Sequence, residues 1–275
     1  DFLSSLPHHP LAQRPLPNTP YPISHTPYPI SHSAASHTLI YMDPARRSQS
    51  GGKVFRIEDC EPNVIDLLPT LRRTASHIMI KFSPMLDITA ALRALGKDWD
   101  THIVAVNNEV KEVLFLTGKG VIHAVNIRTR EMRTDRFFFS PEDEKQAKLQ
   151  LAPHIQQYIY EPNAAIIKAG AFKLVAQRYG LHKMAPNTHL YYSEQLVEDF
   201  PGRVWKIMEV NPKDTKNTCA SVLTRNYPLT PDQLRKKLKI KEGDQLTIIG
   251  ARLGDKPTLF LCKKKCTTLN NPEQC

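Results

Sequence analysis

The chain has 275 residues, of which 41% are hydrophobic and 23% are charged, a balance typical of globular proteins. No stretch approaches the roughly 20 apolar residues that a helix needs to cross a bilayer, so the composition excludes a helical membrane protein. The 37 Lys and Arg residues outnumber the 27 Asp and Glu residues, and the net charge of +10 favours polyanionic partners, nucleic acid first among them. The length allows two or three domains of roughly 100–150 residues.

The cysteines are Cys60, Cys219, Cys262, Cys266 and Cys275. Their odd number and uneven spacing do not suit a disulfide framework, and they indicate a reducing cytoplasm as the location. The chain begins at Asp1, and its first residues lack the basic and apolar regions of a secretory signal. We therefore expect the chain to begin at a cut rather than with a leader.

Residues 1–36 form a segment that is rich in proline and contains only two charged residues, Asp1 and Arg14. Such a composition cannot nucleate a core and predicts an extended loop. Within it the heptapeptide TPYPISH occurs at 19–25 and again at 26–32, a short tandem duplication that suits a polyproline-type conformation. A tolerated surface insertion is the favoured interpretation, and a ligand for a proline-binding partner domain is the alternative.

Residues 37–135 have the alternating strand and helix pattern that is typical of an α/β domain. Apolar runs predict strands at 38–42, 77–81, 102–106 and 121–127, the first of them buried and parallel. Apolar residues at helical spacing predict helices at 63–73 and 84–95, and residues 109–116 fit either a short helix or a strand. This order implies βαβ units and a parallel sheet, with 121–127 as the final strand.

Residues 136–212 are expected to form a small α+β domain. Ser140, followed by a proline and three acidic residues, predicts the start of a helix that Pro153 stops. A longer helix is predicted at 164–179, with Asn163 as its N-cap and Gly180 at its end. Residues 188–192 and 204–210 have the composition of strands.

Residues 213–266 follow a strand, helix, strand, strand order, and residues 267–275 form a tail. A strand is predicted at 219–223, and Thr230 opens a capping-box helix that Gly243 closes. Strands at 246–249 and 258–261 flank a Gly-Asp turn and predict a hairpin. From residue 211 onward there are thirteen Lys and Arg residues against six Asp and Glu residues, so the positive charge is concentrated in this last part.

Polar side chains follow the first two predicted strands where each strand ends. Ligands of an open parallel sheet bind outside the carboxyl ends of its strands, so these side chains and Asp87, which follows them, are expected to face one crevice. The candidate catalytic residues are Asp43, Pro44, Arg46, Arg47, Lys81 and Ser83. The structural alternative is that Asp43 and Pro44 only cap a strand, that both arginines are solvated, and that Ser83 is the N-cap of the next helix.

Other familiar chemistry finds little support in the sequence. Three acidic residues surround Cys60, and their charges should raise the pKa of its thiol, which argues against a nucleophilic cysteine. Cys262 and Cys266 lack the accompanying Cys or His residues of a zinc site, and no metal site is expected. The glycine-rich phosphate-binding and dinucleotide-binding motifs and the common hydrolase motifs do not occur.

A cluster of cations lies near the carboxyl end of the chain. It could be a solvated surface, but its density favours a surface that contacts phosphates. The candidate RNA-binding residues are Arg235, Lys236, Lys237, Lys239, Lys241, Lys263 and Lys264.

A series of motifs extends along the chain from residue 39 to about residue 264. The motifs are DPARR at 43–47, EDCEPN at 58–63, IKFSPMLDI at 80–88, VAVNNEVKE at 104–112, YEPNAAIIKAGAF at 160–172, NTHLY at 187–191 and FPGR at 200–203. In this order they resemble the bacterial class I S-adenosylmethionine-dependent methyltransferases that carry a ferredoxin-like domain and a carboxyl-terminal THUMP-like domain. The Pro-rich repeat lies outside the resemblance.

The resemblance implies an α/β fold, with part of a Rossmann-like methyltransferase core at 37–135, a ferredoxin-like domain at 136–212 and a THUMP-like domain at 213–266. It implies S-adenosyl-L-methionine as cofactor, with Asp43 beside the transferred methyl group and Asp1 and Phe2 at the adenine. It also implies an RNA substrate, by analogy with the THUMP domains of RNA-modifying enzymes. In the family a Gly-rich cofactor loop precedes the segment that corresponds to Asp1. That loop does not occur in this sequence, so we expect the chain to bind the cofactor poorly.

The resemblance further suggests that Asp43 orients or deprotonates the acceptor, while Arg46 and Arg47 hold a substrate phosphate. The segment after Asp43 lacks the aromatic residue that stacks on a flipped base in amino-methylating enzymes. The segment at Lys81 lacks the cysteine nucleophile of uridine C5 methyltransferases, so the methylated atom stays open. The second hypothesis is a non-catalytic RNA-binding protein that uses its basic carboxyl-terminal part, and the oligomeric state stays open in both cases.

Overall fold

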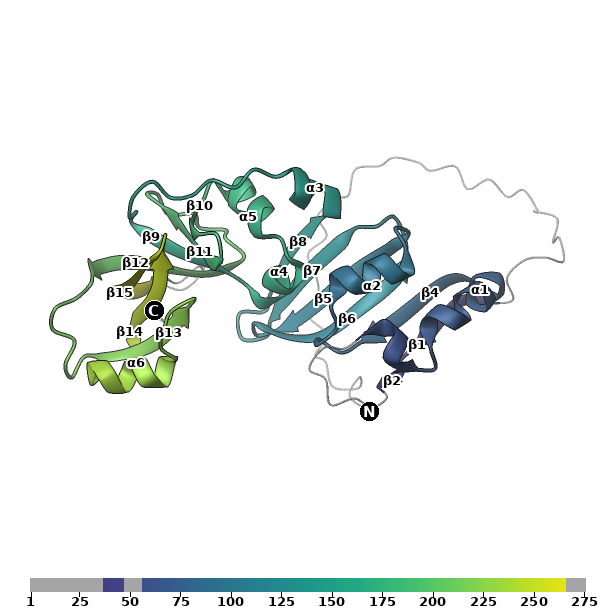
Figure 1. Ribbon diagram of the computed structural model, residues 1–275, viewed down its shortest axis with the longest axis horizontal. Helices are drawn as coiled ribbons and strands as arrows, with labels where there is room; N and C mark the ends of the chain where they lie inside the picture. The colour runs from purple at the N-terminus through teal and green to yellow at the C-terminus, as the bar shows by residue number, and fades with distance from the viewer. Residues whose placement is uncertain (1–36, 47–55, 266–275) are drawn as a thin grey trace, which may run out of the picture. The chain divides into compact units, whose positions relative to one another are not determined.

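The computed structural model describes residues 37–46 and 56–265, which belong to one compact unit of the chain (Figure 1). The predictions for residues 1–36, for Arg47 and for the tail at 267–275 lie outside the described residues. None of the described helices is long and apolar enough to span a bilayer.

A six-stranded mixed sheet forms the first part of this unit, with the strand order β1-β4-β6-β5-β7-β8. Its strands are β1 (His37–Met42), β4 (Ala75–Phe82), β5 (Trp99–Val106), β6 (Glu109–Thr117), β7 (Ile122–Arg128) and β8 (Arg133–Phe139). The pairs β1–β4 and β5–β7 are parallel, and the other neighbours are antiparallel. The four predicted strands are confirmed, but the expectation of a parallel sheet that ends at 121–127 is wrong.

A tight hairpin explains why the sheet is mixed. Asn107 and Asn108, between β5 and β6, have φ values of 49° and 67°, which suit the two-residue turns that join antiparallel strands. β6 therefore folds back beside β5 and lies between β5 and β4. The open choice for residues 109–116 is settled as a strand.

Two helices pack against the buried side chains of this sheet. α1 (Val64–Thr74) begins after Asn63, whose Oδ1 accepts a hydrogen bond from the N–H of Ile65. α2 (Ile88–Leu95) begins after Asp87, whose Oδ1 accepts a hydrogen bond from the N–H of Ala90. The first helix is confirmed, whereas the second starts four residues later than Pro84 because Asp87, and not Ser83, is its N-cap.

The first strand is parallel, as predicted, but it is not buried. Ile40 pairs in register with the buried Ile78. Leu39 and Tyr41 point to the opposite face of the sheet and are 48% and 54% exposed. Among the described residues β1 pairs only with β4, so it forms an edge of the sheet, and the expectation of burial is wrong.

Short helices follow the first sheet. α3 (Pro141–Gln146) has the predicted capping box at Ser140, but it ends well before Pro153. It stops early because the next residues run alongside another strand, where the N–H of Lys183 donates a hydrogen bond to the carbonyl of Gln150 at 2.8 Å.

The predicted long helix at 164–179 is two helices, α4 (Ala164–Ala169) and α5 (Phe172–Tyr179). Asn163 is the N-cap of α4, as expected, but Gly170 adopts a left-handed conformation with φ of 79° and ends that helix. Gly180 ends α5 in the same way, with φ of 62°. α4 packs on the first sheet, and its first N–H donates to Asn108 Oδ1 at 2.8 Å.

A seven-stranded sheet forms the second part, in the order β10-β11-β9-β12-β15-β14-β13. Its strands are β9 (Tyr158–Pro162), β10 (His182–Ala185), β11 (Thr188–Ser193), β12 (Gly202–Val210), β13 (Cys219–Arg225), β14 (Lys241–Leu253) and β15 (Lys256–Lys265). Only β13 and β14 are paired in parallel. β9 and β10 are absent from the sequence-based prediction, and the other strands are confirmed.

α6 (Pro231–Leu238) joins β13 to β14, and β14 and β15 form the predicted hairpin. The capping box at Thr230 is confirmed. The end of the helix is not at Gly243, as expected, because Lys239 takes the left-handed conformation with φ of 54° and Gly243 lies within β14. Gly243 packs so closely against the backbone of Cys219 and Ala220 that a Cβ atom there would approach them within 3.0 Å.

Candidate functional site

The carboxyl ends of β1 and β4 border a small pocket. Because these strands are parallel neighbours, Asp43 and Pro44 follow β1 at the same edge of the sheet where Lys81 and Ser83 lie at the end of β4. All four residues line one pocket of about 220 Å³. The structure thus brings together four of the six candidate catalytic residues.

An ion pair organises this pocket. Lys81 Nζ lies 2.5 Å from Asp43 Oδ2, and the two side chains are 28% and 50% exposed. The hydrogen bond with Asp43 raises the pKa of Lys81, and the negative charge of Glu112 acts in the same direction. Lys81 therefore keeps its proton and holds the Asp43 carboxylate in place beside the pocket.

Two further charged residues, Lys111 and Glu112, reach the pocket from β6. β6 is antiparallel to β4, with Val113 opposite Phe82, so Glu112 lies next to the end of β4. Lys111 Nζ also lies 2.6 Å from Glu109 Oε2. Sequence reasoning missed both residues because the pairing of β6 with β4 was not known, although both belong to the VAVNNEVKE motif.

Ser83 has a structural role besides lining the pocket. Its Oγ accepts a hydrogen bond from the N–H of Met85 at 3.3 Å, in the turn that leads to α2. Asp87, which the sequence placed beside the crevice, instead caps α2 and is not among the residues that line the pocket.

The remaining candidate residues of the sequence analysis are not among the described residues that line this pocket. The backbone of Arg46 belongs to β2 (Ala45–Arg46), which pairs with β3 (Cys60–Glu61), and a 3-10 turn at Ile57–Asp59 directly precedes β3. Cys60 is buried, and its thiol donates to the carbonyl of Arg56 at 3.9 Å, which agrees with a structural role. Arg47, Asp1 and Phe2 lie outside the described residues.

A second candidate surface surrounds the end of α6. Lys236, Lys237, Lys239 and Lys241 are exposed on α6 and on the residues that follow it. Arg235 is half-buried instead, and its guanidinium donates to the carbonyl of Ala220 at 3.3 Å, which ties α6 to β13. The structure therefore gives Arg235 a packing role that its neighbours do not share.

Lys263 and Lys264 point to opposite faces of the second sheet, because adjacent residues in a strand alternate. Lys263 lies opposite Lys206 of β12, whereas Lys264 lies opposite Trp205, whose ring belongs to the core on the other face. Leu261, two residues before Lys263, packs with the core beneath α6, so Lys263 shares the face of α6 and Lys264 does not.

One lysine that the sequence analysis did not select joins this surface. Lys216 is exposed in the loop before β13, and the next residue, Asn217, donates its N–H to the carbonyl of Lys239 at 3.2 Å. We call the set Lys216, Lys236, Lys237, Lys239 and Lys241 the basic α6 surface.

Comparisons with known proteins identify the domains of the second part. Residues 158–201 match the family model of a ferredoxin-like domain, and residues 202–264 match that of a THUMP-like domain. The crystal structure of a candidate methyltransferase from Porphyromonas gingivalis W83 matches with a TM-score of 0.74 and 36% sequence identity over 83% of this chain. The resemblance to S-adenosylmethionine-dependent methyltransferases is confirmed.

Two curated methyltransferases of this kind, both uncharacterised and from strains of Mycobacterium tuberculosis, are 22% identical over 243 residues and 82% of this chain. The chain spans 64% of the length of these methyltransferases and 60% of the Porphyromonas gingivalis protein. The α/β fold with ferredoxin-like and THUMP-like domains is confirmed, and the names of the relatives support S-adenosylmethionine as the cofactor of this family. The seven-stranded sheet is shared between both domains, since β9 to β11 fall in the first match and β12 to β15 in the second.

The described residues of the pocket at β1 and β4 are mixed in charge and enclose a small volume. Asp43 and Glu112 place two carboxylates at the pocket, and Lys81 and Lys111 place two ammonium groups there, so the charges of its lining balance. The volume of about 220 Å³ is smaller than the roughly 300–1,000 Å³ of sites that enclose a whole small molecule. The described part of the pocket is therefore too small to enclose a whole cofactor.

Proposed function

We propose that the protein acts in the transfer of a methyl group from S-adenosylmethionine to RNA, in the cytoplasm. The observation that carries this proposal is the pocket at the carboxyl ends of β1 and β4, where the DPAR segment places Asp43 against Lys81. Similarity to methyltransferases supports the reaction, and the THUMP-like domain supports RNA as the substrate.

In this proposal Asp43 accepts a hydrogen bond from the RNA group that is methylated, and it takes the proton that this group loses. Lys81 fixes the carboxylate through their ion pair. The bound cofactor supplies an electrophilic methyl group. Arg46 and Arg47, which follow Asp43 after Pro44 and Ala45, hold a phosphate of the substrate.

The basic α6 surface holds the RNA backbone in the same proposal. Its lysines are exposed, and the part of the chain from residue 211 onward contains thirteen Lys and Arg residues against six acidic residues. Such a surface binds phosphates with little regard to base sequence, and the binding weakens as salt displaces it.

Replacing Lys236 and Lys237 by Ala together is expected to weaken RNA binding about tenfold or more at low salt, because two phosphate contacts are lost. The dependence of log Kd on log salt should become shallower by about 1.4, since each contact to a single strand contributes about 0.7. Fluorescence anisotropy across a salt series measures both values. The control variant replaces Lys97 and Lys119, two exposed lysines in loops between elements of the first part, and an equal loss in that control would contradict a local surface.

Incubation of the intact enzyme with bacterial RNA and methyl-labelled S-adenosylmethionine tests the proposed function. We expect label in RNA that ribonuclease releases. RNA binding without any transfer of label would overturn the proposal in favour of the second hypothesis, a non-catalytic RNA-binding protein.

A further inference from the structure

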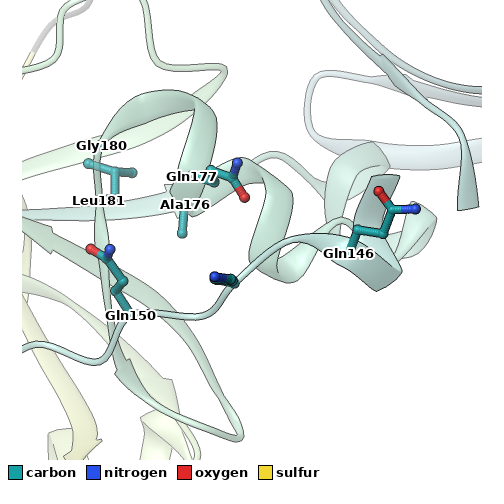
Figure 2. A pocket seen from close by; sticks show the side chains of 7 residues that line it. Gln146, Gln150, Ala176, Gln177, Gly180 and Leu181 are labelled. Atoms are coloured by element: carbon teal, nitrogen blue, oxygen red, sulfur yellow. The ribbon is translucent and has the colours of Figure 1, made fainter. Parts of the chain in front are cut away.

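A second pocket, larger than the one at Asp43, lies between α5 of the ferredoxin-like match and the segment before that match. It has a volume of about 460 Å³, within the usual range for small-molecule sites. One side is the segment after α3, which contributes Gln146, Lys148 and Gln150, and the other is the end of α5, with Ala176 and Gln177. In Figure 2 the Gln150 side chain extends from this segment toward the side where Ala176 and Leu181 lie.

Both sides of this pocket are held by hydrogen bonds. The N–H of Lys183 in β10 donates to the carbonyl of Gln150 at 2.8 Å, and the N–H of Ala152 donates to the carbonyl of Lys183 at 2.9 Å. The Glu144 carboxylate accepts hydrogen bonds from three N–H groups in the first turn of α5, at 2.9 to 3.2 Å. The pocket is therefore largely formed before any ligand binds.

The polar groups of the pocket have hydrogen-bonding capacity to spare. Gln146 reaches only the nearby Glu142, at 3.3 Å. The side chains of Lys148, Gln150 and Gln177 make no hydrogen bond or ion pair with any described residue. Ala176 and Leu181 are about 2% exposed and supply an apolar floor.

We propose that this pocket binds one nucleotide of a single-stranded segment of the RNA, a conclusion that rests on the proposed function. A primary amide offers a donor and an acceptor side by side, which matches the edge of a nucleobase, so Gln150 and Gln177 read the base. The face of the base contacts Ala176 and Leu181. Lys148, the only cation of the pocket, binds the phosphate.

The charge of the pocket distinguishes this ligand from others. A single ammonium among three amides does not suit a polyphosphate or an isolated anion, which would need several cations or N–H groups. An apolar ligand would gain nothing from the three amides, which are exposed and can keep their water. A base with one phosphate uses two of the three amides, the ammonium and the apolar floor.

Substitutions in the full chain test the proposal. Fluorescence anisotropy measures the binding of three single-stranded RNA oligomers, each of eight identical nucleotides, A, C or U. Gln177→Ala should weaken binding of the preferred oligomer by about 5- to 100-fold and reduce the differences among the three bases. Lys148→Ala should weaken all three about equally and make the salt dependence shallower by about 0.7. These side chains are on the surface, and unchanged thermal unfolding of the variants verifies their fold.

Gln157→Ala, at an exposed glutamine outside the pocket, is the matched control and should bind like the unchanged chain. Unchanged affinity in Gln177→Ala and Lys148→Ala, with a loss in the Lys236 and Lys237 variant, would overturn the pocket proposal and leave RNA binding standing. No binding of any oligomer to the unchanged chain would overturn both. Tighter binding of a free nucleoside monophosphate than of any oligomer would replace RNA by a free nucleotide and also overturn the proposal.

Discussion

Asp43→Ala in the intact enzyme is expected to lower the rate of methyl transfer at least 100-fold while RNA affinity changes less than twofold. A positioned general base contributes about 10²- to 10⁴-fold to a reaction rate. Alanine removes the carboxylate and leaves Lys81 without its ion-pair partner, so a positive charge would face the developing positive charge of the acceptor. Single-turnover transfer of a labelled methyl group measures the chemical step directly.

Two variants sharpen this result. Lys81→Met should lower the rate less than Asp43→Ala, because the carboxylate remains but is no longer fixed by the ammonium. Glu131→Gln changes an exposed acid far from the pocket in the sequence and should leave the rate unchanged. If Asp43→Ala retains the full rate, the role of Asp43 in proton transfer is wrong.

Glu161→Ala is expected to lower the free energy of unfolding by about 3 kcal/mol, because it removes one partner of a buried charge cluster. The Glu161 side chain is 2% exposed and binds two guanidinium groups, with Arg225 Nε at 2.5 Å from Oε1 and Arg203 on Oε2. The side chains of Arg203 and Arg225 are 37% and 36% exposed, so water can solvate their charges once Glu161 is gone. The expected loss of stability is therefore at the low end of the range for a broken buried ion pair.

The cluster also crosses from one domain to the other. Glu161 belongs to β9 in the ferredoxin-like match, whereas Arg203 and Arg225 belong to β12 and β13 in the THUMP-like match. Loss of Glu161 should therefore weaken the contact between the two domains as well as lower the free energy of unfolding. Denaturant unfolding with Glu198→Ala, an exposed acid, as control measures the effect, and equal stability of both variants would contradict it.

This cluster shows why a motif need not be a catalytic site. Glu161 lies in the YEPN segment and Arg203 in the FPGR segment, which both contributed to the resemblance. Gly202 is required there as well, since a Cβ atom would lie 2.0 Å from the carbonyl oxygen of Glu161. The segments hold two domains together, a role that depends on strand pairing and is invisible in the sequence.

Local sequence patterns predicted where helices begin better than they predicted how strands pair and where helices end. Capping residues such as Ser140 and Thr230 marked helix starts correctly because their hydrogen bonds involve residues close in sequence. The direction of β6 depended on the turn at Asn107 and Asn108, and the split of the 164–179 helix on the left-handed Gly170. A glycine can occupy a helix, a strand or a turn, so its conformation had to come from the structure.

The sequence predicted those residues of the candidate site that lie at the ends of parallel strands. Asp43 and Lys81 were found because the carboxyl ends of adjacent parallel strands meet. Glu112 was not found, because it reaches the pocket from an antiparallel strand whose partner the sequence does not specify. The division between Lys263 and Lys264 follows from the two-residue period of a strand and could have been predicted once that strand was assigned.

Calorimetric titration of S-adenosylmethionine tests most directly whether this is a methyltransferase. We would titrate the cofactor into the present chain and into a version extended upstream through a Gly-rich cofactor loop. We predict one-to-one binding to the extended version, competed by S-adenosylhomocysteine, and much weaker binding to the present chain. No binding to either version would contradict the proposed methyl transfer.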